Sequence, residues 1–579
     1  MIKRLLGCVR EYKLPSILTL IFIIGEVIIE VLIPFITADL VNSIKAGVEM
    51  SELLKTGGLL AIMAVVSLTC GGVAAFTCAK ASAGFAKNLR GDLFRKIQTY
   101  SFENIDNFST ASLVTRLTTD IGNVQMSYMM IIRTAIRSPL MFIFSIIMAY
   151  TMGGALATTF VVVVPVLITG LLLVSRKAMP AFRRVFKKYD RLNESIEENV
   201  RGMRVVKGFS RENYERKRFG EASEDIAGDF TKAERIVALN TPIMQVCLYF
   251  NMVFVLTFGS YLIISGTGSN IDVGQLSAML TYGMQILMSL MMLSMIYVIL
   301  TMSTESFKRI YEVLREEPTL TSPEGGKTEV KNGSIDFNSV SFKYSKKAKR
   351  NALSDIDIHI ESGMTVGIIG GTGSSKTTLV QLIPRLYDAT EGSVKVGGVD
   401  VREYDLRTLR DSVSMVLQKN LLFSGTIKEN LRWGNPDATD EEMIEACRLA
   451  QAHDFVSSFP EGYDTFIEQG GTNVSGGQKQ RLCIARALLG KPKILILDDS
   501  TSAVDTRTDA LIRAGFKKFI PETTKIIIAQ RISSVEDADM IIVLDKGAIS
   551  AVGKHEELLE SSDIYREVYE QQTGGKENE

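Results

Sequence analysis

A glycine-rich segment in the second half of the chain has the composition of a loop that binds phosphate groups. The apolar run Val366–Ile369 is followed by Gly370-Gly371-Thr372-Gly373-Ser374-Ser375-Lys376-Thr377-Thr378, and then by a helical pattern through Tyr387. A strand, a glycine-rich turn and a helix start together present backbone N–H groups and a helix N-terminus to anions. In such a loop Lys376 reaches the β- and γ-phosphates of a nucleotide, and the hydroxyl of Thr377 binds Mg²⁺.

One position departs from the usual pattern of this loop. Glycine normally precedes the lysine, but the residue here is Ser375. Because a serine can take the conformation of an ordinary residue at the start of a helix, we expect the loop to form and to hold phosphate either more tightly or more weakly. An ordinary glycine-rich turn is the alternative for this segment when it is considered alone.

A second segment, Lys493–Asp499, reads Lys-Ile-Leu-Ile-Leu-Asp-Asp. An unbroken apolar run that ends in carboxylates is typical of a buried strand in a parallel sheet. Asp498 then lies where a phosphate loop requires a carboxylate that coordinates Mg²⁺. A strand that ends in aspartate indicates little by itself, but together with the loop it predicts a nucleotide site.

A third segment lies between these two, and its core Ser475-Gly476-Gly477-Gln478 resembles the signature motif of ATP-binding cassette (ABC) proteins. Three motifs in this order resemble an ABC exporter half-transporter over essentially the whole chain. The resemblance implies that Tyr344 stacks on the adenine of ATP, and that Gln418 senses Mg²⁺ and contacts the membrane domain. An ordinary strand tyrosine is the alternative for Tyr344.

The resemblance extends to further segments. Ser502-Ala503-Val504-Asp505 resembles the D-loop, and Asp106–Ser112 and Phe209–Tyr214 resemble the coupling helices that dock on nucleotide-binding domains. The cofactors that the resemblance implies are ATP and Mg²⁺, with Thr377, Gln418 and Asp498 as the metal ligands.

Two positions that carry catalysis in this family differ in this chain. The family has glutamate directly after Asp498, where this chain has Asp499, and histidine in the switch motif, where this chain has Gln530. Shortening the carboxylate by one methylene moves it by about 1 Å or more, and misplacement on that scale can cost about 10²-fold in rate. Glutamine has no imidazole that could accept a proton.

The departures at Ser375, Asp499 and Gln530 fall on one side of the nucleotide site, whereas the signature motif is intact. In this family ATP is held between the phosphate loop of one subunit and the signature of the other. We therefore expect a heterodimer in which a different half-transporter supplies the catalytic glutamate and histidine, and in which this chain's own site hydrolyses ATP slowly or not at all. Two alternatives stay open, namely a homodimer with two slow sites and a regulator that binds ATP without transporting.

The first half of the chain has the composition of a membrane domain. Of the 579 residues, 46% are hydrophobic and 22% charged, and several apolar stretches reach the ~20 residues that span a bilayer. We expect six transmembrane helices of the type IV ABC exporter kind in residues 1–305, a linker in 306–332, and an α/β nucleotide-binding domain with the P-loop in 333–579. The expected spans are Leu14–Leu40, Leu59–Ala79, Ser138–Met152, Ala155–Leu173, Pro242–Ile264 and Gln275–Met302.

Lysine and arginine are concentrated near the N-terminus and in two long connections, 80–137 and 176–235. Because positive charge favours the cytoplasmic side, we expect both termini, the long connections and the nucleotide-binding domain in the cytoplasm, and the protein in the cell membrane. The long connections are too long to be structureless. The apolar period in Asn193–Val206 predicts helices that extend beyond the membrane.

The charge balance excludes one class of partner. Lys+Arg and Asp+Glu both number 65, so no basic face predicts a nucleic acid. Glu26 and Glu30 lie one turn apart in the first span, and we expect them either to bind a cation or to face water. Arg133 and Arg137 are expected to face the cytoplasmic vestibule or to anchor the membrane interface. The family resemblance suggests a drug, a lipid or a peptide as substrate, with membrane lipid and a second half-transporter as partners.

Overall fold

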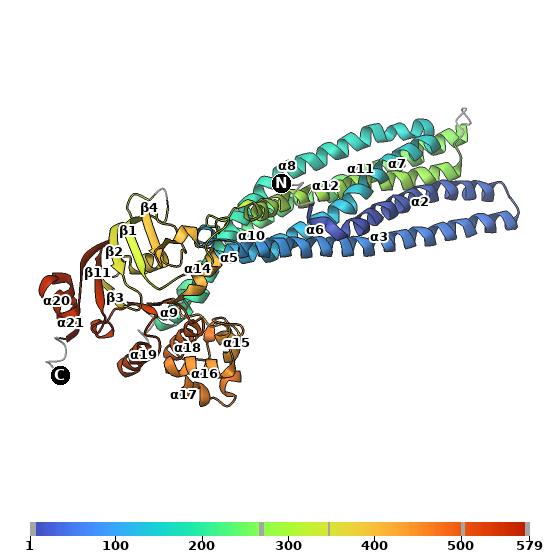
Figure 1. Cartoon of the computed structure of the whole chain (residues 1–579). Helices are drawn as coiled ribbons and strands as arrows, with labels where there is room; N and C mark the ends of the chain where they lie inside the picture. Colours follow the sequence, from blue (N-terminus) through green and yellow to red (C-terminus); the bar gives the residue numbers. More distant parts are fainter. Residues whose placement is uncertain (1–6, 266–270, 346–347, 500–503, 574–579) are drawn as a thin grey trace. The chain divides into compact units, whose positions relative to one another are not determined.

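The computed structural model describes residues 7–265, 271–345, 348–499 and 504–573, and it separates into two compact units (Figure 1). The first unit comprises Met1–Gln98 and Ser109–Glu316, and the second comprises Thr99–Phe108 and Glu317–Glu579. The short segment Thr99–Phe108 therefore packs with the C-terminal half of the chain, although it lies early in the sequence.

Long α-helices make up the first unit. Among the described residues, six helical stretches are long and apolar enough to cross a membrane, which confirms the predicted number of spans. The predicted spans correspond to α2 (Lys13–Lys45), α3 (Met50–Gln98), α7 (Thr134–Gly153), α8 (Thr159–Arg201), α11 (Asn240–Ser265) and α12 (Val273–Arg315). The elements that join them are η1 (Gly7–Tyr12), α5 (Thr110–Thr115), η2 (Arg116–Asp120), α6 (Ile121–Ile132), η3 (Gly154–Thr158), α9 (Met203–Gly208) and α10 (Glu212–Ala238).

The long connections between spans are helical. α3 continues to Gln98 and α8 to Arg201, well past the ends of their apolar stretches. Lys188 of α8 forms ion pairs with Asp225 and Asp229 of α10 at 2.7 and 2.6 Å, which join the two helices side by side. The helical extensions that the apolar period predicted are therefore present.

α12 continues to Arg315, into the segment 306–332 that was predicted to be a linker. Its lysine, arginine and glutamate residues are good helix formers, and Ile310 and Val313 are fully buried within it. The helix ends at Arg315 with Glu316 as its C-cap, and Pro318 follows, where the missing N–H prevents a further helical turn. The non-helical connection is therefore shorter than predicted, because the charge of this segment concealed a helical apolar period.

An arginine of α7 pairs with two of the acidic side chains of α2, Glu26 and Glu30. Nη2 of Arg137 lies 2.7 Å from Glu30 Oε2 and 3.5 Å from Glu26 Oε1. A Cβ atom at Gly71 of α3 would lie 3.0 Å from Glu26 Oε1, so the α3 backbone closes over this carboxylate. The cation beside the two carboxylates is thus a side chain of the protein itself, a role that was not among those predicted for Arg137.

Two main β-sheets form the second unit, which confirms the predicted α/β domain (Figure 1). The larger has six strands in the order β12-β11-β3-β10-β9-β6, parallel except for β12. The smaller is antiparallel, with the order β2-β1-β4-β5. The strands are β1 (Ile335–Phe342), β2 (Leu353–Ile360), β3 (Thr365–Gly370), β4 (Glu391–Val396), β5 (Val399–Asp400), β6 (Val413–Val416), β9 (Ile494–Asp498), β10 (Thr524–Ile528), β11 (Met540–Asp545) and β12 (Ala548–Gly553), with the short pair β7 (Gly425–Thr426) and β8 (Phe466–Ile467) elsewhere.

The six-stranded sheet separates two hydrophobic cores. Val366 and Ile368 of β3 pack in one core with Phe337 of the smaller sheet. Leu497 of β9 packs in the other core with residues of the surrounding helices, such as Leu482. The helices of this unit are α4 (Phe102–Asn107), α13 (Lys376–Gln381), α14 (Leu406–Ser412), α15 (Ile427–Leu431), α16 (Asp440–Leu449), α17 (His453–Ser457), α18 (Gly476–Leu489), α19 (Thr506–Phe519), α20 (His555–Ser561) and α21 (Asp563–Thr573).

Candidate functional site

Four of the predicted motifs lie at the carboxyl ends of neighbouring parallel strands. β3 ends at Gly370, β9 ends at Asp498, β10 leads to Gln530, and β6 leads to Gln418. The register places Ile528 of β10 opposite Asp498, so these ends are level. Ligands of open α/β sheets bind outside the carboxyl ends of the strands. The sheet therefore gathers motifs that are separated in the sequence.

The ammonium group of Lys376 lies against the glycine-rich loop. Its Nζ donates to Gly370 O at 2.8 Å and to Gly371 O at 2.9 Å. Burial lowers the pKa of Lys376, and the negative charges of Asp498 and Asp499 act in the opposite direction. A bound anion would favour the charged ammonium further, so the surroundings of this lysine suit a phosphate group.

Ser375 adopts the left-handed backbone conformation, with φ 71° and ψ 26°, at the N-cap of α13. The expectation that it takes an ordinary conformation at the start of a helix was therefore wrong. This conformation costs a residue with a Cβ atom roughly 1–2 kcal/mol, whereas glycine adopts it readily. The loop of this chain thus carries backbone strain immediately before Lys376, and the usual pattern has glycine there for this reason.

α13 is shorter than the helical run through Tyr387 that was predicted. It ends at Gln381, and turns follow it. Pro384 explains the early end, because proline has no N–H to donate and restricts the residue before it. Outside the helix, the ring of Tyr387 packs against that of Tyr344, with the centroids 5.3 Å apart.

The residue after β9, Asp499, is buried and is bonded to two glutamines. Nε2 of Gln530 donates to Asp499 Oδ2 at 2.6 Å, and Nε2 of Gln418 donates to the same oxygen at 3.3 Å. Hydrogen bonds to an ionised acceptor are stronger than neutral ones. Asp499 and Gln530, two of the three positions predicted to differ from the family pattern, therefore contact each other directly.

Thr377 and Asp498 contact each other, and Gln418 lies beside the next residue, Asp499. Thr377 Oγ1 donates to Asp498 Oδ1 at 3.1 Å, and Gln418 contacts the adjacent residue Asp499. Burial raises the pKa of Asp498, and the hydrogen bond from Thr377 opposes this. Hydroxyl, carboxylate and amide oxygens are the hard ligands that suit Mg²⁺, and a divalent cation would offset the cost of the buried carboxylate. The residues present therefore fit the metal that the family implies.

Tyr344 follows β1 and lies beside the phosphate loop. Its hydroxyl shares a hydrogen bond with Thr378 Oγ1 at 2.8 Å. The residue is 46% exposed, which distinguishes it from the fully buried Tyr404 of the same unit. Its position next to the loop and the open side of its ring suit stacking on a nucleotide base.

The signature motif begins helix α18. Ser475 is its N-cap, and its hydroxyl accepts a hydrogen bond from the backbone N–H of Gln478 at 3.3 Å, while Gln478 Oε1 accepts from the N–H of Ser475 at 2.9 Å. Ser475 and Gly476 are exposed, whereas Leu482 and Ile484 on the same helix are buried. The helix N-terminus is thus anchored by its apolar face and open to an anion.

Both predicted coupling helices are displaced from the helices that the structure contains. The segment Asp106–Ser112 spans the end of α4, a break at Phe108 and Ser109, and the start of α5. The segment Phe209–Tyr214 likewise spans the break between α9 and α10. These boundaries were predicted wrongly, because caps such as Ser109 are recognised only from the hydrogen bonds they make. Of the predicted D-loop, Ser502 and Ala503 lie outside the described residues.

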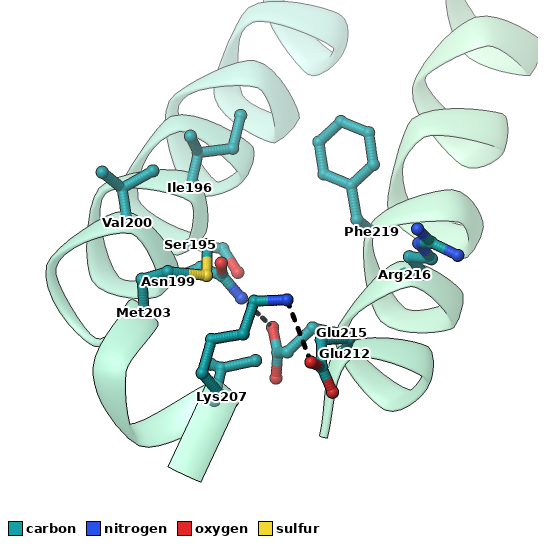
Figure 2. A pocket seen from close by; sticks show the side chains of 11 residues that line it. Ser195, Ile196, Asn199, Val200, Met203, Lys207, Glu212, Glu215, Arg216 and Phe219 are labelled. Atoms are coloured by element: carbon teal, nitrogen blue, oxygen red, sulfur yellow. Dashed lines mark hydrogen bonds and ion pairs between the residues drawn. The ribbon is translucent and has the colours of Figure 1, made fainter. Parts of the chain in front are cut away.

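A hollow of about 530 Å³ lies between the end of α8, α9 and the start of α10 (Figure 2). Lys207 donates to Glu212 Oε1 at 3.0 Å and Asn199 donates to Glu215 Oε2 at 2.8 Å, which fixes the turn on one side of the hollow. Phe209, in the turn itself, is 75% exposed. The turn therefore presents apolar surface at the end of the first unit. Ile196, Val200, Met203 and Phe219 line the hollow.

The sequence did not identify the residues that hold α4 in the second unit. Tyr387 donates its hydroxyl to Asp106 Oδ2 at 2.6 Å, and its ring contacts Phe102. The only signal in the sequence was an aromatic residue shortly after the phosphate loop, and nothing in the spacing connects it to a segment 281 residues earlier.

The fold is that of an ABC exporter half-transporter, and the chain belongs to the ABC transporter family. The family model of the ABC transporter transmembrane region matches residues 16–290, and the family model described as ABC transporter matches residues 353–502. The recognition of an ABC half-transporter from the three motifs is thereby confirmed.

Particular relatives cover most or all of the chain. An uncharacterized ABC transporter ATP-binding protein of Bacillus subtilis, YfiB, is 35% identical over 577 residues, which are 100% of each chain. A fatty acid ABC transporter ATP-binding/permease protein of Mycobacterium bovis is 34% identical over 479 residues, 82% of this chain and 75% of that one. The solved structure of a bacterial Atm1-family ABC exporter with ATP bound matches with a TM-score of 0.83 and 22% identity, over 97% of this chain and 98% of the other. The predicted exporter fold is therefore confirmed.

Proposed function

We propose that this chain is one subunit of a two-chain ABC exporter that uses ATP to export or flip a small amphipathic molecule, and that its own nucleotide site is degenerate. The second chain is a different half-transporter. The protein lies in the cell membrane, with both termini and the nucleotide-binding domain in the cytoplasm. The observation that carries the degeneracy is the direct contact of Asp499 with Gln530 at 2.6 Å.

The binding half of the chemistry is well supported. Lys376 and the backbone of the loop bind the phosphates, and Tyr344 stacks on the base. Thr377, Gln418 and Asp498 hold Mg²⁺, which when bound neutralises charge on the phosphates. The raised pKa of the buried Asp498 and the lowered pKa of the half-buried Lys376 both favour a site filled by charged ligands of the opposite sign.

The hydrolytic half of the chemistry is impaired. A water that attacks the γ-phosphate needs a carboxylate at the correct distance, and Asp499 is one methylene too short. Its Oδ2 also accepts hydrogen bonds from Gln530 and Gln418, so reaching toward the water requires breaking contacts to the protein. Gln530 can donate to a phosphate oxygen but cannot take up a proton. Binding without rapid hydrolysis is the result we expect.

The signature motif supports a role for this chain in a second, competent site. Its capped and exposed helix N-terminus is complete, so it can close on ATP that is bound to the phosphate loop of the partner. The exposed apolar turn around Phe209 supports docking of the first unit on a nucleotide-binding domain. An amphipathic substrate agrees with the name of the relative from Mycobacterium bovis, which is a fatty acid transporter; drugs and peptides are the other candidates.

The full-length chain in lipid nanodiscs, alone and with a co-expressed second half-transporter, tests this proposal. We expect the lone chain to bind Mg²⁺–ATP with little turnover, and the pair to hydrolyse ATP and to move labelled substrate into inverted vesicles. Rapid turnover by the lone chain would favour the homodimeric exporter instead. ATPase activity of the pair without movement of any drug, lipid or peptide would favour a regulator that binds ATP.

A further inference from the structure

An aromatic cluster in the second unit lies between the predicted adenine contact and the helix α4. The rings of Tyr344 and Tyr387 pack edge to face, with centroids 5.3 Å apart and an angle of 86° between their planes. Phe342 packs against both, at 4.9 Å from Tyr344 and 5.6 Å from Tyr387. Tyr344 is 46% exposed, so these contacts leave part of its ring accessible to a ligand.

Tyr387 connects this cluster to α4. Its hydroxyl donates to Asp106 Oδ2 at 2.6 Å, and its ring packs against Phe102 with the centroids 6.1 Å apart. Burial and the Asp106 carboxylate both raise the pKa of Tyr387, so the hydroxyl keeps its proton and stays a donor at neutral pH. A hydroxyl that donates to a carboxylate makes a stronger hydrogen bond than one to a neutral acceptor.

Asn104 adds a second set of contacts to α4, outside this cluster. Asn104 is fully buried, its Nδ2 donates to Glu317 O at 3.1 Å, and its Oδ1 accepts from the N–H of Thr319 at 3.1 Å. The helix is therefore held by two sets of contacts: Asn104 joins it to the chain that follows α12, and Phe102 and Asp106 join it to the aromatic cluster.

We propose that Tyr387 is a positioning residue that couples adenine binding at Tyr344 to the placement of α4. The proposal rests on the function proposed above, in which Tyr344 stacks on adenine. Close-packed rings cannot shift independently, so a base on the open side of Tyr344 restricts Tyr387 and, with it, the hydroxyl that holds Asp106. Phosphate groups without a base contact Lys376 and the loop but have no ring to stack on Tyr344.

Amide hydrogen exchange of the full-length protein in nanodiscs tests the coupling. The peptide that contains Phe102–Asn107 is followed without ligand, with Mg²⁺ and a non-hydrolysable ATP analogue, and with Mg²⁺ and tripolyphosphate, which has no base. We expect the ATP analogue to change the exchange of this peptide and tripolyphosphate to leave it unchanged. In Tyr387→Phe, which keeps the ring but lacks the hydroxyl, the response to the analogue should be lost while its affinity stays within about 2-fold of the native value.

Two further variants separate positioning from general damage. Asp106→Asn retains an oxygen that accepts from the Tyr387 hydroxyl, so we expect it to keep the response, whereas Asp106→Leu should lose it. Tyr404→Phe removes the hydroxyl of another tyrosine in the same unit, which donates to Val396 O at 2.9 Å, and should keep the response.

The outcomes distinguish this inference from the function on which it rests. If the native chain binds the analogue and the α4 peptide does not respond, or if Tyr387→Phe responds as the native chain does, the coupling is refuted and the proposed function stands. An equal response to tripolyphosphate also refutes it. If the native chain binds no nucleotide, the proposed function fails and this inference fails with it.

Discussion

If this site is degenerate as proposed, the contact between Asp499 and Gln530 leads to a specific prediction about how hydrolysis can be increased there. Replacing Asp499 with glutamate restores the length of the carboxylate, and a correction of about 1 Å is worth about 10²-fold in rate. In the structure, however, two amides hold this carboxylate, with Gln530 Nε2 only 2.6 Å from Oδ2. A hydrogen bond to a charged group is worth about 1.5–3 kcal/mol, which opposes release of the carboxylate to the water.

We therefore expect the two substitutions to be non-additive. Asp499→Glu alone should raise hydrolysis at this site by less than about 10-fold, because Gln530 can still bind the longer carboxylate. Gln530→His alone should raise it little, since the short aspartate remains. The double variant should gain about 10²-fold, which corresponds to a coupling free energy within the 0.5–3 kcal/mol found for residues in contact.

Single-turnover hydrolysis of ATP by the full-length chain, alone and with its partner, measures this double-mutant cycle. Asp499→Gln, which has the length of glutamate without its charge, is the matched control and should gain nothing. The reasoning is refuted if Asp499→Glu alone reaches the rate of the double variant, or if the two gains add to within about 0.5 kcal/mol, the limit for independent sites.

Three other predictions follow from single positions. Ser375→Gly removes a serine in the left-handed conformation. It should stabilise the protein by about 0.5–1 kcal/mol in thermal unfolding, after the added flexibility of the unfolded chain is subtracted. An equal gain in stability from Ser375→Ala would contradict the claim of backbone strain at this position. Burial raises the pKa of Asp498, so the protonated side chain stabilises the nucleotide-free fold at low pH and this contribution is lost as the pH rises through the raised pKa. Asp498→Asn should accordingly unfold at a higher temperature than the native chain at neutral pH, and at the same temperature in acid. The variant should also lose the stabilisation by Mg²⁺–ATP. A difference in unfolding temperature that does not depend on pH would count against the burial argument. Arg137→Gln should destabilise the first unit by about 1.5–3 kcal/mol, the value of a hydrogen bond to a charged group, and Glu30→Gln in the same chain should recover part of the loss; full additivity of the two changes would argue against the ion pair.

The chemistry of the site was predictable because it depends on residue types in local motifs. The phosphate loop, Asp498 and the signature each have their own pattern, and the six apolar stretches follow directly from composition. Parallel strands then bring the motifs together, since their carboxyl ends meet at one edge of the sheet. The departures at Asp499 and Gln530 were visible in the same way, as single residues within patterns.

What the sequence did not provide depends on backbone conformation and on contacts between distant segments. The left-handed conformation of Ser375 is imposed by the loop, and a serine by itself does not reveal it. The breaks at Phe108 and Phe209 depend on caps and turns that compete with helical propensity. The contacts of Asp499 with Gln530, and of Tyr387 with Asp106, join residues that are 31 and 281 positions apart, and neither pair has a pattern in the sequence.

The central claim is that this chain contributes a sound signature motif and an impaired phosphate-loop site to a two-chain transporter. The most direct measurement compares two variants of this chain in the assembled pair, Gly477→Asp in the signature and Asp499→Asn beside β9. We predict that Gly477→Asp reduces steady-state ATP hydrolysis of the pair by about 10²-fold or more, because a carboxylate at the α18 N-terminus repels the phosphates of the partner's ATP, and that Asp499→Asn changes it by less than about 2-fold. The opposite result, with activity lost in Asp499→Asn and retained in Gly477→Asp, would contradict the account.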